Sequence, residues 1–285
     1  MNAQDHLPAQ SGTSESVTSV ANLISDVLSG MYGTDPLTLY VVGAFYVQQS
    51  TQFPGTRQKY RNYYLIVRGG EAFGACCVER GQLAPIVAEE LSGQSVAELL
   101  NDERLPVRIA ALDAYFGAVL PHREAPFARV CMLPYGAALE RARARDEAIA
   151  SLLTLQPGQC VGLIGVVDPL VAAIQQYRAN CLPCDFNMER TQDGLEVVKD
   201  MQPVLERADV IIATGMTLSN GSFDEILATV RRRGIPLIVY AQTGSGIVPC
   251  FLGNGVNAIC ADPFPFSQSS AEPTPIYLYR EGEFR

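Results

Sequence analysis

The spacing of hydrophobic and polar positions changes near the middle of the chain. Before that point, apolar positions recur at helical intervals from Val17 until Gly33 ends the pattern. Three β-rich runs, which together indicate an antiparallel meander, then cover residues 37–47, 63–67 and 73–78. Two helices follow, one capped by Ser95 and one with Pro106 in its first turn. We therefore predict an α+β domain over residues 14–125.

After a helix predicted over 137–153, strand and helix patterns alternate. The predicted strands cover 161–165, 210–214, 235–240 and 258–260. The predicted helices cover 169–177, 195–206, 223–232 and 246–252. Such alternation is typical of a parallel, Rossmann-like sheet, and residues 276–279 add an edge strand. The predicted fold class is therefore α/β. The second domain covers residues 126–285 and includes the linker helix, and residues 1–13 are predicted to be a disordered tail.

Composition narrows the choice of partners and compartment. Hydrophobic residues make up 48% of the chain and charged residues 18%, with a net charge of −9, so we expect neither nucleic acid nor an anionic membrane as a partner. No apolar run approaches the roughly 18 residues of a membrane span, and the polar start lacks a secretion signal. Several of the eight cysteines lie in apolar runs, which favours a reduced, cytoplasmic protein.

Small polar residues and glycines follow three of the predicted parallel strands. The first group is Gly165 to Asp168, where Asp168 precedes a helix and is either an N-cap or a ligand group. The second group contains Thr214, Gly215, Thr217, Asn220 and Gly221. The third contains Gln242, Thr243, Gly244 and Ser245. Because the carboxyl ends of parallel strands form the binding edge of open α/β sheets, we predict that these groups bind a small ligand.

Other candidate motifs are weaker. The turn at Gly165 has one glycine where the dinucleotide fingerprint has three, and Asp185 ends no clear strand, so tightly held NAD is not expected. Cys181 and Cys184 are either a metal or redox pair or part of a structural loop. His122 fits a structural role at a helix end. The basic, aromatic segment 57–63 is either a solvated loop or a wall of an interdomain cleft.

The stretch 208–225 resembles the motif ADVVIITGTTLVNGTLDE of a bacterial and archaeal heavy-metal chelation family. Residues 165–170, 91–100 and 108–113 resemble further parts of that family. The resemblance implies an enolase N-terminal-like domain joined to a Rossmann-like domain, a site in the cleft between them, and a homodimer. The site residues that it implies are Gly165, Asp168, Thr214, Gly215, Thr217, Asn220 and Gly221.

The chain departs from that family at residues 242–245, where a Gly-Pro-Ser/Thr sequence is usual, and it has only two histidines. We therefore expect it to bind, and to convert if it is an enzyme, a small polar or amino-acid-like metabolite or its metal complex. Conversion would be of the lyase, transferase or chelatase type, with Asp168 as acid/base group. One alternative is a transition-metal chelatase or metallochaperone using Cys181, Cys184, Asp168 and His122. A second is a degenerate NAD(P)-dependent oxidoreductase.

Overall fold

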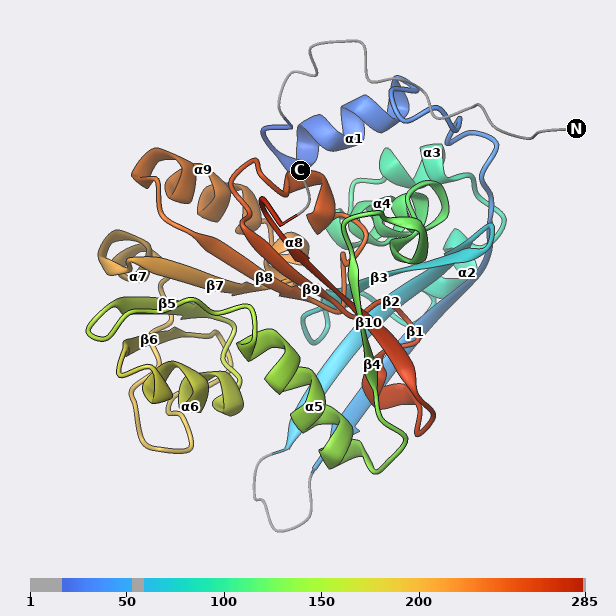
Figure 1. Cartoon of the computed structure of the whole chain (residues 1–285). Coiled ribbons are helices and arrows are strands. Elements are labelled where there is room, and N and C mark those ends of the chain that lie inside the picture. The colour runs from blue at the N-terminus through green and yellow to red at the C-terminus, as the bar shows by residue number, and fades with distance from the viewer. Residues whose placement is uncertain (1–16, 53–58, 284–285) are drawn as a thin grey trace, which may run out of the picture.

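The computed structural model describes residues 17–52 and 59–283, and it contains two β-sheets flanked by helices (Figure 1). The tail predicted over residues 1–13 lies outside the described residues, as do His6 and Arg57. The smaller sheet comes from the N-terminal part of the chain, and the larger sheet comes from the rest. This arrangement confirms the α/β fold class.

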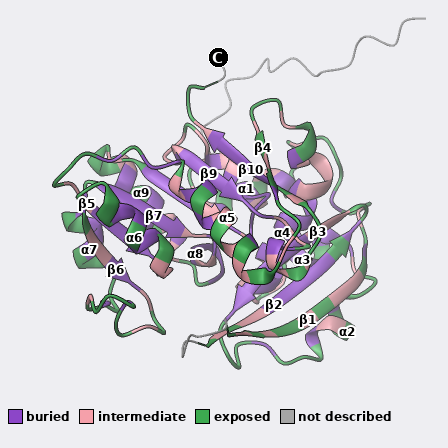
Figure 2. Ribbon diagram, turned by 60° about the horizontal axis from the view of Figure 1, so that its bottom comes forward, coloured by how far each residue is buried: buried purple, intermediate pink, exposed green. Residues whose placement is uncertain are grey.

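The smaller sheet is an antiparallel meander of three strands, as predicted. They are β1 Val41–Thr51, β2 Tyr60–Gly69 and β3 Ala72–Val78. Figure 2 shows β1 as a largely exposed edge strand and β2 as largely buried. Gly74 in β3 has a helix directly above it, because a Cβ at this position would lie 2.1 Å from Ala110 O. A larger residue would push that helix off the sheet.

Four helices accompany the smaller sheet: α1 Val20–Leu28, α2 Val87–Leu91, α3 Val96–Leu100 and α4 Leu105–Val119. The hydroxyl of Ser19 caps α1 by accepting a hydrogen bond from Asn22 N. The capping box predicted at Ser95 is present at the start of α3, and Pro106 lies in the first turn of α4 as predicted. The signals at Ser95 and Pro106 confirm the predicted starts of α3 and α4, whereas α1 is shorter than the pattern from Val17 to Gly33 that predicted it.

The larger sheet has seven strands in the order β4-β10-β9-β8-β7-β5-β6. Their bounds are β4 Arg129–Leu133, β5 Cys160–Ile164, β6 Asn180–Cys184, β7 Val210–Thr214, β8 Leu237–Ala241, β9 Ala258–Ala261 and β10 Thr274–Arg280. Strands β5 to β9 are parallel, and β10 is antiparallel to both β9 and β4. The predicted strands of the Rossmann-like part are therefore confirmed.

Helices cover this sheet on both faces. They are α5 Ala138–Ala150, α6 Asp168–Gln176, α7 Gln202–Arg207, α8 Met216–Ser219 and α9 Phe223–Arg233, with 3₁₀ turns at His122–Glu124, Val248–Phe251 and Ser267–Ser269. Gly234 ends α9 in the left-handed conformation, at φ +63°. Within the described ranges, no helix combines the length and the apolar character that crossing a membrane requires.

Three predictions about the larger sheet were wrong, and one strand was missed. Residues 181–184 belong to strand β6 and not to a loop, and of the predicted helix 195–206 only residues 202–206 are helical, in α7. Strand β10 lies between β9 and β4 and is not an edge strand, while β4 was missed. Pairing of β4 with β10 joins Leu133 to Thr274, so no local pattern in the sequence signals it.

Candidate functional site

The strand order creates a switch point between β5 and β7. The chain passes from β5 to β6 on one side and then returns to β7 on the other side of β5. The helices that follow these strands, α6 and α9, therefore lie on opposite faces of the sheet. In doubly wound sheets, ligands bind at such a point. Gly165 and Thr214, two of the predicted site residues, stand at these two strand ends.

Gly165, Thr214 and Tyr240 are in close contact at this point. A Cβ at Gly165 would lie 2.4 Å from Thr214 Cγ2 and 3.1 Å from Tyr240 Oη. The Tyr240 hydroxyl donates a hydrogen bond of 2.6 Å to Gly165 O. The residue has φ +84°, which glycine adopts readily and other residues rarely do. The structure thus brings together the ends of three neighbouring strands, β5, β7 and β8.

The third predicted loop converges on the same region but is packed under the smaller sheet. A Cβ at Gly215 would lie 2.4 Å from Thr243 O, so the loops after β7 and β8 touch. Gly244 N donates to Ala75 O of β3 at 3.0 Å. Thr243 and Ser245 are buried. Gln242, which is partly exposed, is the residue of this loop that donates hydrogen bonds to the polar side chains described below.

Asp113 of α4 fastens that loop to the smaller sheet. Its carboxylate accepts hydrogen bonds from Ala75 N at 2.8 Å and from Gly246 N at 2.7 Å. Burial raises the pKa of Asp113 to about 7, although the backbone N–H donors act in the opposite direction. Asp113 therefore links the two sheets through one buried carboxyl group.

The second predicted loop is divided by the structure. Thr214 and Gly215 lie at the strand edge, whereas Thr217 is buried and its hydroxyl donates to Thr214 O at 2.7 Å. Asn220 and Gly221 are exposed at the far end of α8, where Asn220 Oδ1 accepts from the backbone N–H of Ser222. The Ser222 side chain also donates to Asn220 Oδ1 and makes no cap hydrogen bond to α9.

A polar cluster that the sequence did not reveal lies at the ends of β8 and β9. We call it the edge cluster; it consists of Arg145, Asp146, Gln242, Asp262 and Gln268. Arg145 pairs with Asp146 at 3.0 Å and donates to Gln268 Oε1 at 3.3 Å. Gln242 Nε2 donates at 2.8 Å to both Asp262 Oδ2 and Gln268 Oε1. A hydrogen bond of 3.3 Å from Gln268 to Gln49 of β1 connects the cluster to the smaller sheet.

Burial acts on both charges of the ion pair in the edge cluster. Burial disfavours the charged form of Arg145. The carboxylates of Asp146 and Asp262 favour that form more strongly, so the pKa of the guanidinium is raised. Burial also raises the pKa of Asp146, which Arg145 partly offsets. The pair therefore depends on its own geometry for stability, because either member alone would be a buried, uncompensated charge.

Three tyrosines stand around this edge. Burial is the main cause that raises the pKa of Tyr60, Tyr64 and Tyr240. Carboxylates add to the effect: Asp168 and Asp146 act on Tyr60, Asp262 acts on Tyr64, and Asp185 and Asp146 act on Tyr240. All three hydroxyls therefore remain protonated hydrogen-bond donors near neutral pH. Tyr60 belongs to the segment 57–63, for which the sequence allowed either a solvated loop or a wall of an interdomain cleft.

For Asp168 the structure contradicts the N-cap alternative, and for Asp185 it contradicts the prediction about its strand. Asp168 is the first residue of α6 and does not cap it; its Oδ1 accepts from Gln192 N at 2.8 Å. Asp185 directly follows β6, so the prediction that it ends no strand was wrong. Its Oδ2 accepts from Val166 N at 3.0 Å and so holds the turn after Gly165.

The two cysteines proposed as metal ligands are not brought together. Cys181 packs on one face of the larger sheet and Cys184 in the core on the other face, as expected for positions three apart in a strand. Burial raises the pKa of Cys181 to about 12 and that of Cys184 to about 11, which disfavours the thiolate. Within residues 17–52 and 59–283, no three His, Cys, Asp or Glu side chains are grouped so that they could hold a metal ion.

His122 makes its contacts with β10 and not with the edge cluster. Its ring stacks on Tyr277, and Nδ1 lies 2.6 Å from Tyr279 Oη. Burial lowers the pKa of His122 to about 4, so it is neutral and does not act as the cation expected at a helix end.

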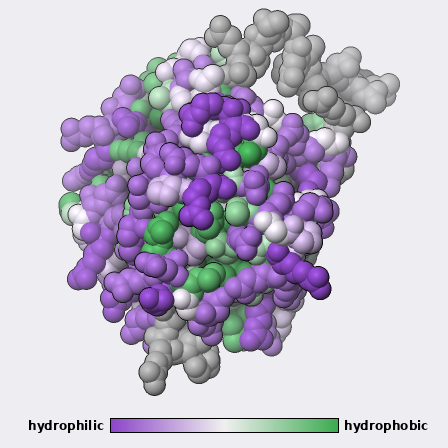
Figure 3. Space-filling view, turned by 90° about the vertical axis from the view of Figure 1, so that its left-hand side faces the viewer, coloured by the Kyte–Doolittle hydropathy of each residue, from purple (hydrophilic) through white to green (hydrophobic). Residues whose placement is uncertain are grey.

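Two cavities lie away from the edge cluster. One, of about 290 Å³, is lined by residues at the starts of β7, β8 and β9, including Val210, Ile238 and Ala258. Figure 3 shows the side of the molecule on the left of Figure 1, which is mainly hydrophilic with a few hydrophobic side chains near its centre. The other cavity, between α1, α4 and α9, contains neither Gly165 nor Thr214 in its walls.

Comparisons with known proteins agree with this fold. The family model DUF364, described as "Putative heavy-metal chelation", matches residues 147–261. The crystal structure of a DUF364 protein of unknown function from Desulfitobacterium hafniense DCB-2 is similar, with a TM-score of 0.57 at 12% identity, covering 91% of this chain and 99% of that chain. A DUF364 protein from Pyrococcus horikoshii gives a TM-score of 0.54 at 14% identity, covering 91% and 97%. These structures show a shared fold, and a comparison with curated proteins gives no match.

Proposed function

We propose that the strand edge around Gly165 and Thr214, within the residues 147–261 that match the DUF364 family model, binds a small amino-acid-like metabolite. The edge cluster and the three tyrosines form the wall of this site. The observation that carries the proposal is the convergence of β5, β7 and β8 at the switch point, seen in the contacts of Gly165 with Thr214 and Tyr240.

Charge favours a ligand with an amino group. Among the described residues, the charged side chains that act on Tyr60, Tyr64 and Tyr240 are four carboxylates and one guanidinium, namely Asp146, Asp168, Asp185, Asp262 and Arg145. This excess of negative charge is complementary to an ammonium group. The hydroxyls of the tyrosines and the amides of Gln242 and Gln268 supply neutral hydrogen-bonding partners for the rest of the ligand. In any conversion, Asp168 is the acid/base candidate.

Metal chelation, the activity in the family description, finds little support in the residues themselves. The described part of the chain groups no three side chains of the types that hold transition metals, and Cys181 and Cys184 face opposite ways. We infer that a metal would enter this site only as a complex that brings its own ligands. Replacing Cys181 and Cys184 together with Ser is then expected to leave zinc, nickel and cobalt binding unchanged; a loss of one equivalent of metal would support the chelatase.

A homodimer is part of the proposal. The edge strand β1 exposes Val42, Phe45 and Val47, which a second copy could cover. Sedimentation velocity of the wild type and of Phe45→Lys tests this: the dimer predicts a shift of the variant to monomer, and an already monomeric wild type contradicts it.

The ligand proposal is tested by one substitution with a matched control. Asp168→Asn removes a carboxylate charge but keeps an acceptor for Gln192 N. Asp209→Asn is its control, because Asp209 also accepts one backbone hydrogen bond, from Cys160 N, but lies at the start of β7 on the opposite edge.

Calorimetric titration of the full chain with a panel of α- and ω-amino acids, and with their desamino analogues, gives the measurement. We expect at least one amino acid to bind the wild type and Asp209→Asn equally, to bind Asp168→Asn at least tenfold more weakly, and to lose affinity without its amino group. Absence of binding across the panel, or equal binding to all three proteins, would refute the proposal.

A further inference from the structure

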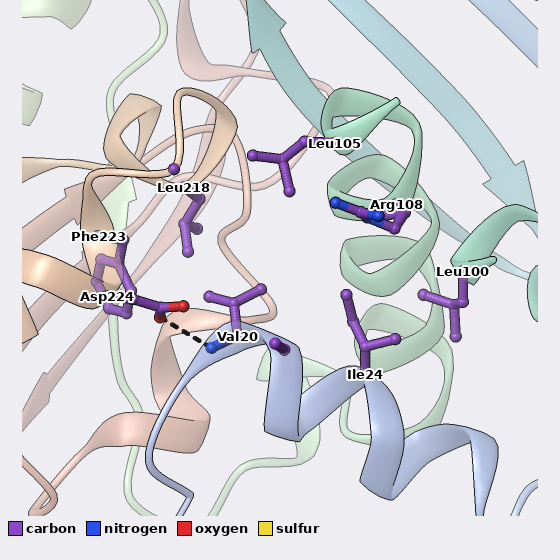
Figure 4. Close-up of a pocket in the computed structure, with 10 residues that line it drawn as sticks. Val20, Ile24, Leu100, Leu105, Arg108, Leu218, Phe223 and Asp224 are labelled. Atoms are coloured by element: carbon purple, nitrogen blue, oxygen red, sulfur yellow. Dashed lines mark hydrogen bonds between the residues drawn. The ribbon is translucent and has the colours of Figure 1, made fainter. Parts of the chain in front are cut away.

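A cavity of about 310 Å³ lies between α1, the α3–α4 pair and the segment that joins α8 to α9. Its walls are mainly apolar and include Val20, Ile24, Leu100, Leu105, Leu218 and Phe223. Figure 4 shows these side chains arranged around a common space. The volume is at the lower end of the range for small-molecule sites, and the lining has the apolar character of such sites. This cavity shares no residue with the edge cluster.

One cationic side chain, Arg108 of α4, lines this cavity. Arg108 Nε is buried and has no hydrogen-bond partner within the described part of the chain. Its Nη1 makes one long hydrogen bond, of 3.3 Å, to Asp102 O. A buried donor without an acceptor is unfavourable, and most such groups in proteins are satisfied by a protein group, a water or a ligand. Figure 4 places the guanidinium at the cavity wall, between Leu105 and Leu100.

The acidic residue of the lining is engaged elsewhere. Asp224 Oδ1 accepts a hydrogen bond of 2.9 Å from Val20 N, which fastens the first turn of α1 to the start of α9. In Figure 4, Asp224 lies across the cavity from Arg108. An anionic group bound at Arg108 would therefore stay away from this carboxylate, with apolar side chains between the two.

We propose that this cavity is a second ligand site that binds a small apolar carboxylate, meaning an aliphatic or aromatic monocarboxylic acid. The carboxylate accepts hydrogen bonds from the guanidinium of Arg108, including its unpartnered Nε, and this planar group matches carboxylate geometry. The apolar body packs against Val20, Ile24 and Leu218. A single cation among apolar walls favours a monoanion over a polyphosphate. The inference does not depend on the edge cluster having a ligand.

The first test titrates the full chain with octanoate and, separately, with octan-1-ol, using calorimetry. We expect one equivalent of octanoate to bind and octan-1-ol to bind more weakly, because the alcohol has no charge for Arg108. The variant Arg108→Gln should weaken octanoate binding at least tenfold. Arg123→Gln is the matched control, since that arginine is exposed outside the cavity, and it should leave the affinity unchanged.

A second variant tests the space independently of the charge. Ala21 is an exposed residue of α1 at the cavity lining, so Ala21→Trp would fill the entrance without altering the core. It should abolish octanoate binding, whereas Ala228→Trp, at an exposed position of α9 outside the lining, should not. Lack of saturable octanoate binding to the wild type would overturn the proposal. Binding that survives both Arg108→Gln and Ala21→Trp would overturn it as well.

Discussion

At the scale of single residues, Asp113 is the side chain on which the junction of the two sheets most depends. It is buried in α4, and its two oxygens accept one backbone N–H from β3 and one from the loop after β8. An amide at this position would have one oxygen only, and its NH₂ group would face an N–H donor. The isosteric substitution is therefore a sensitive probe of the junction.

We predict that Asp113→Asn lowers the free energy of unfolding by about 1–3 kcal/mol, the typical loss for a buried hydrogen-bonding group left unsatisfied. Urea unfolding followed by circular dichroism measures it. Asp35→Asn is the control, because Asp35 is exposed and its carboxylate also accepts a backbone hydrogen bond, from Leu37 N. Equal stability of the two variants would show that Asp113 does not hold the junction.

The same carboxyl group predicts a pH dependence. Its pKa is raised to about 7 in the folded protein, above the value of about 4 expected for an unfolded chain. Its contribution to stability is therefore complete below pH 4 and is lost as the pH rises to 7. The difference in the free energy of unfolding between wild type and Asp113→Asn should therefore become smaller as the pH rises from 4 to 7. Parallel stability curves between pH 4 and 7 would contradict this assignment.

At the scale of elements, the strand ends determine where the site lies. The loops after β5 and β7 meet because Gly165 leaves room for Thr214 and Tyr240. Since the contact is between backbone and side chains of neighbouring strands, a single added carbon is enough to disturb it.

We predict that Gly165→Ala is more destabilising than Gly158→Ala. Both glycines have positive φ, +84° and +86°, so both variants lose about 1 kcal/mol through backbone strain. A Cβ at Gly158 meets nothing within 4 Å, whereas one at Gly165 would lie 2.4 Å from Thr214 Cγ2, which adds about 1–3 kcal/mol for overpacking. Denaturant unfolding of both variants gives the comparison. Equal losses would mean that the strand ends are not in close contact.

The sequence predicted elements where the pattern is local. Four of the five parallel strands and the capping box at Ser95 follow from spacing and residue type. Strand β4 and the central place of β10 did not, because their pairing joins segments about 140 residues apart and depends on tertiary packing.

The site was predicted only in part, for the same reason. Gly165 and Gln242 directly follow strands and Thr214 ends one, so all three could be placed at the edge from the sequence. Arg145 and Gln268 could not, because one lies on a helix that precedes the parallel strands and the other on a turn 123 residues further along the chain. The sequence signal that could have indicated Arg145 is the Arg-Asp pair in an otherwise alanine-rich helix, but such pairs are usually solvated.

At the scale of the whole molecule, the smaller sheet covers one side of the strand edge through β3, α4 and the start of β2. Gly244 N donates to Ala75 O of β3 and Gly246 N donates to Asp113 of α4, whereas the edge cluster reaches this sheet through the hydrogen bond from Gln268 to Gln49 of β1. The smaller and the larger sheet, each with its helices, therefore meet in two ways. One contact is the buried junction at Asp113, and the other is a polar boundary at Tyr60, Tyr64 and Gln49. A ligand at the polar boundary would touch residues from both halves.

The most direct test of the proposed site is a map of backbone amide chemical shifts while the best-binding amino acid is titrated into the ¹⁵N-labelled full chain. We predict that the largest shifts occur at Gly165, Val166 and Gly215, at the carboxyl ends of β5 and β7. Amides at the opposite edge, such as Gly158 and Asp209, should remain unchanged. Shifts centred on that opposite edge, or spread evenly over the molecule, would contradict ligand binding at the switch point.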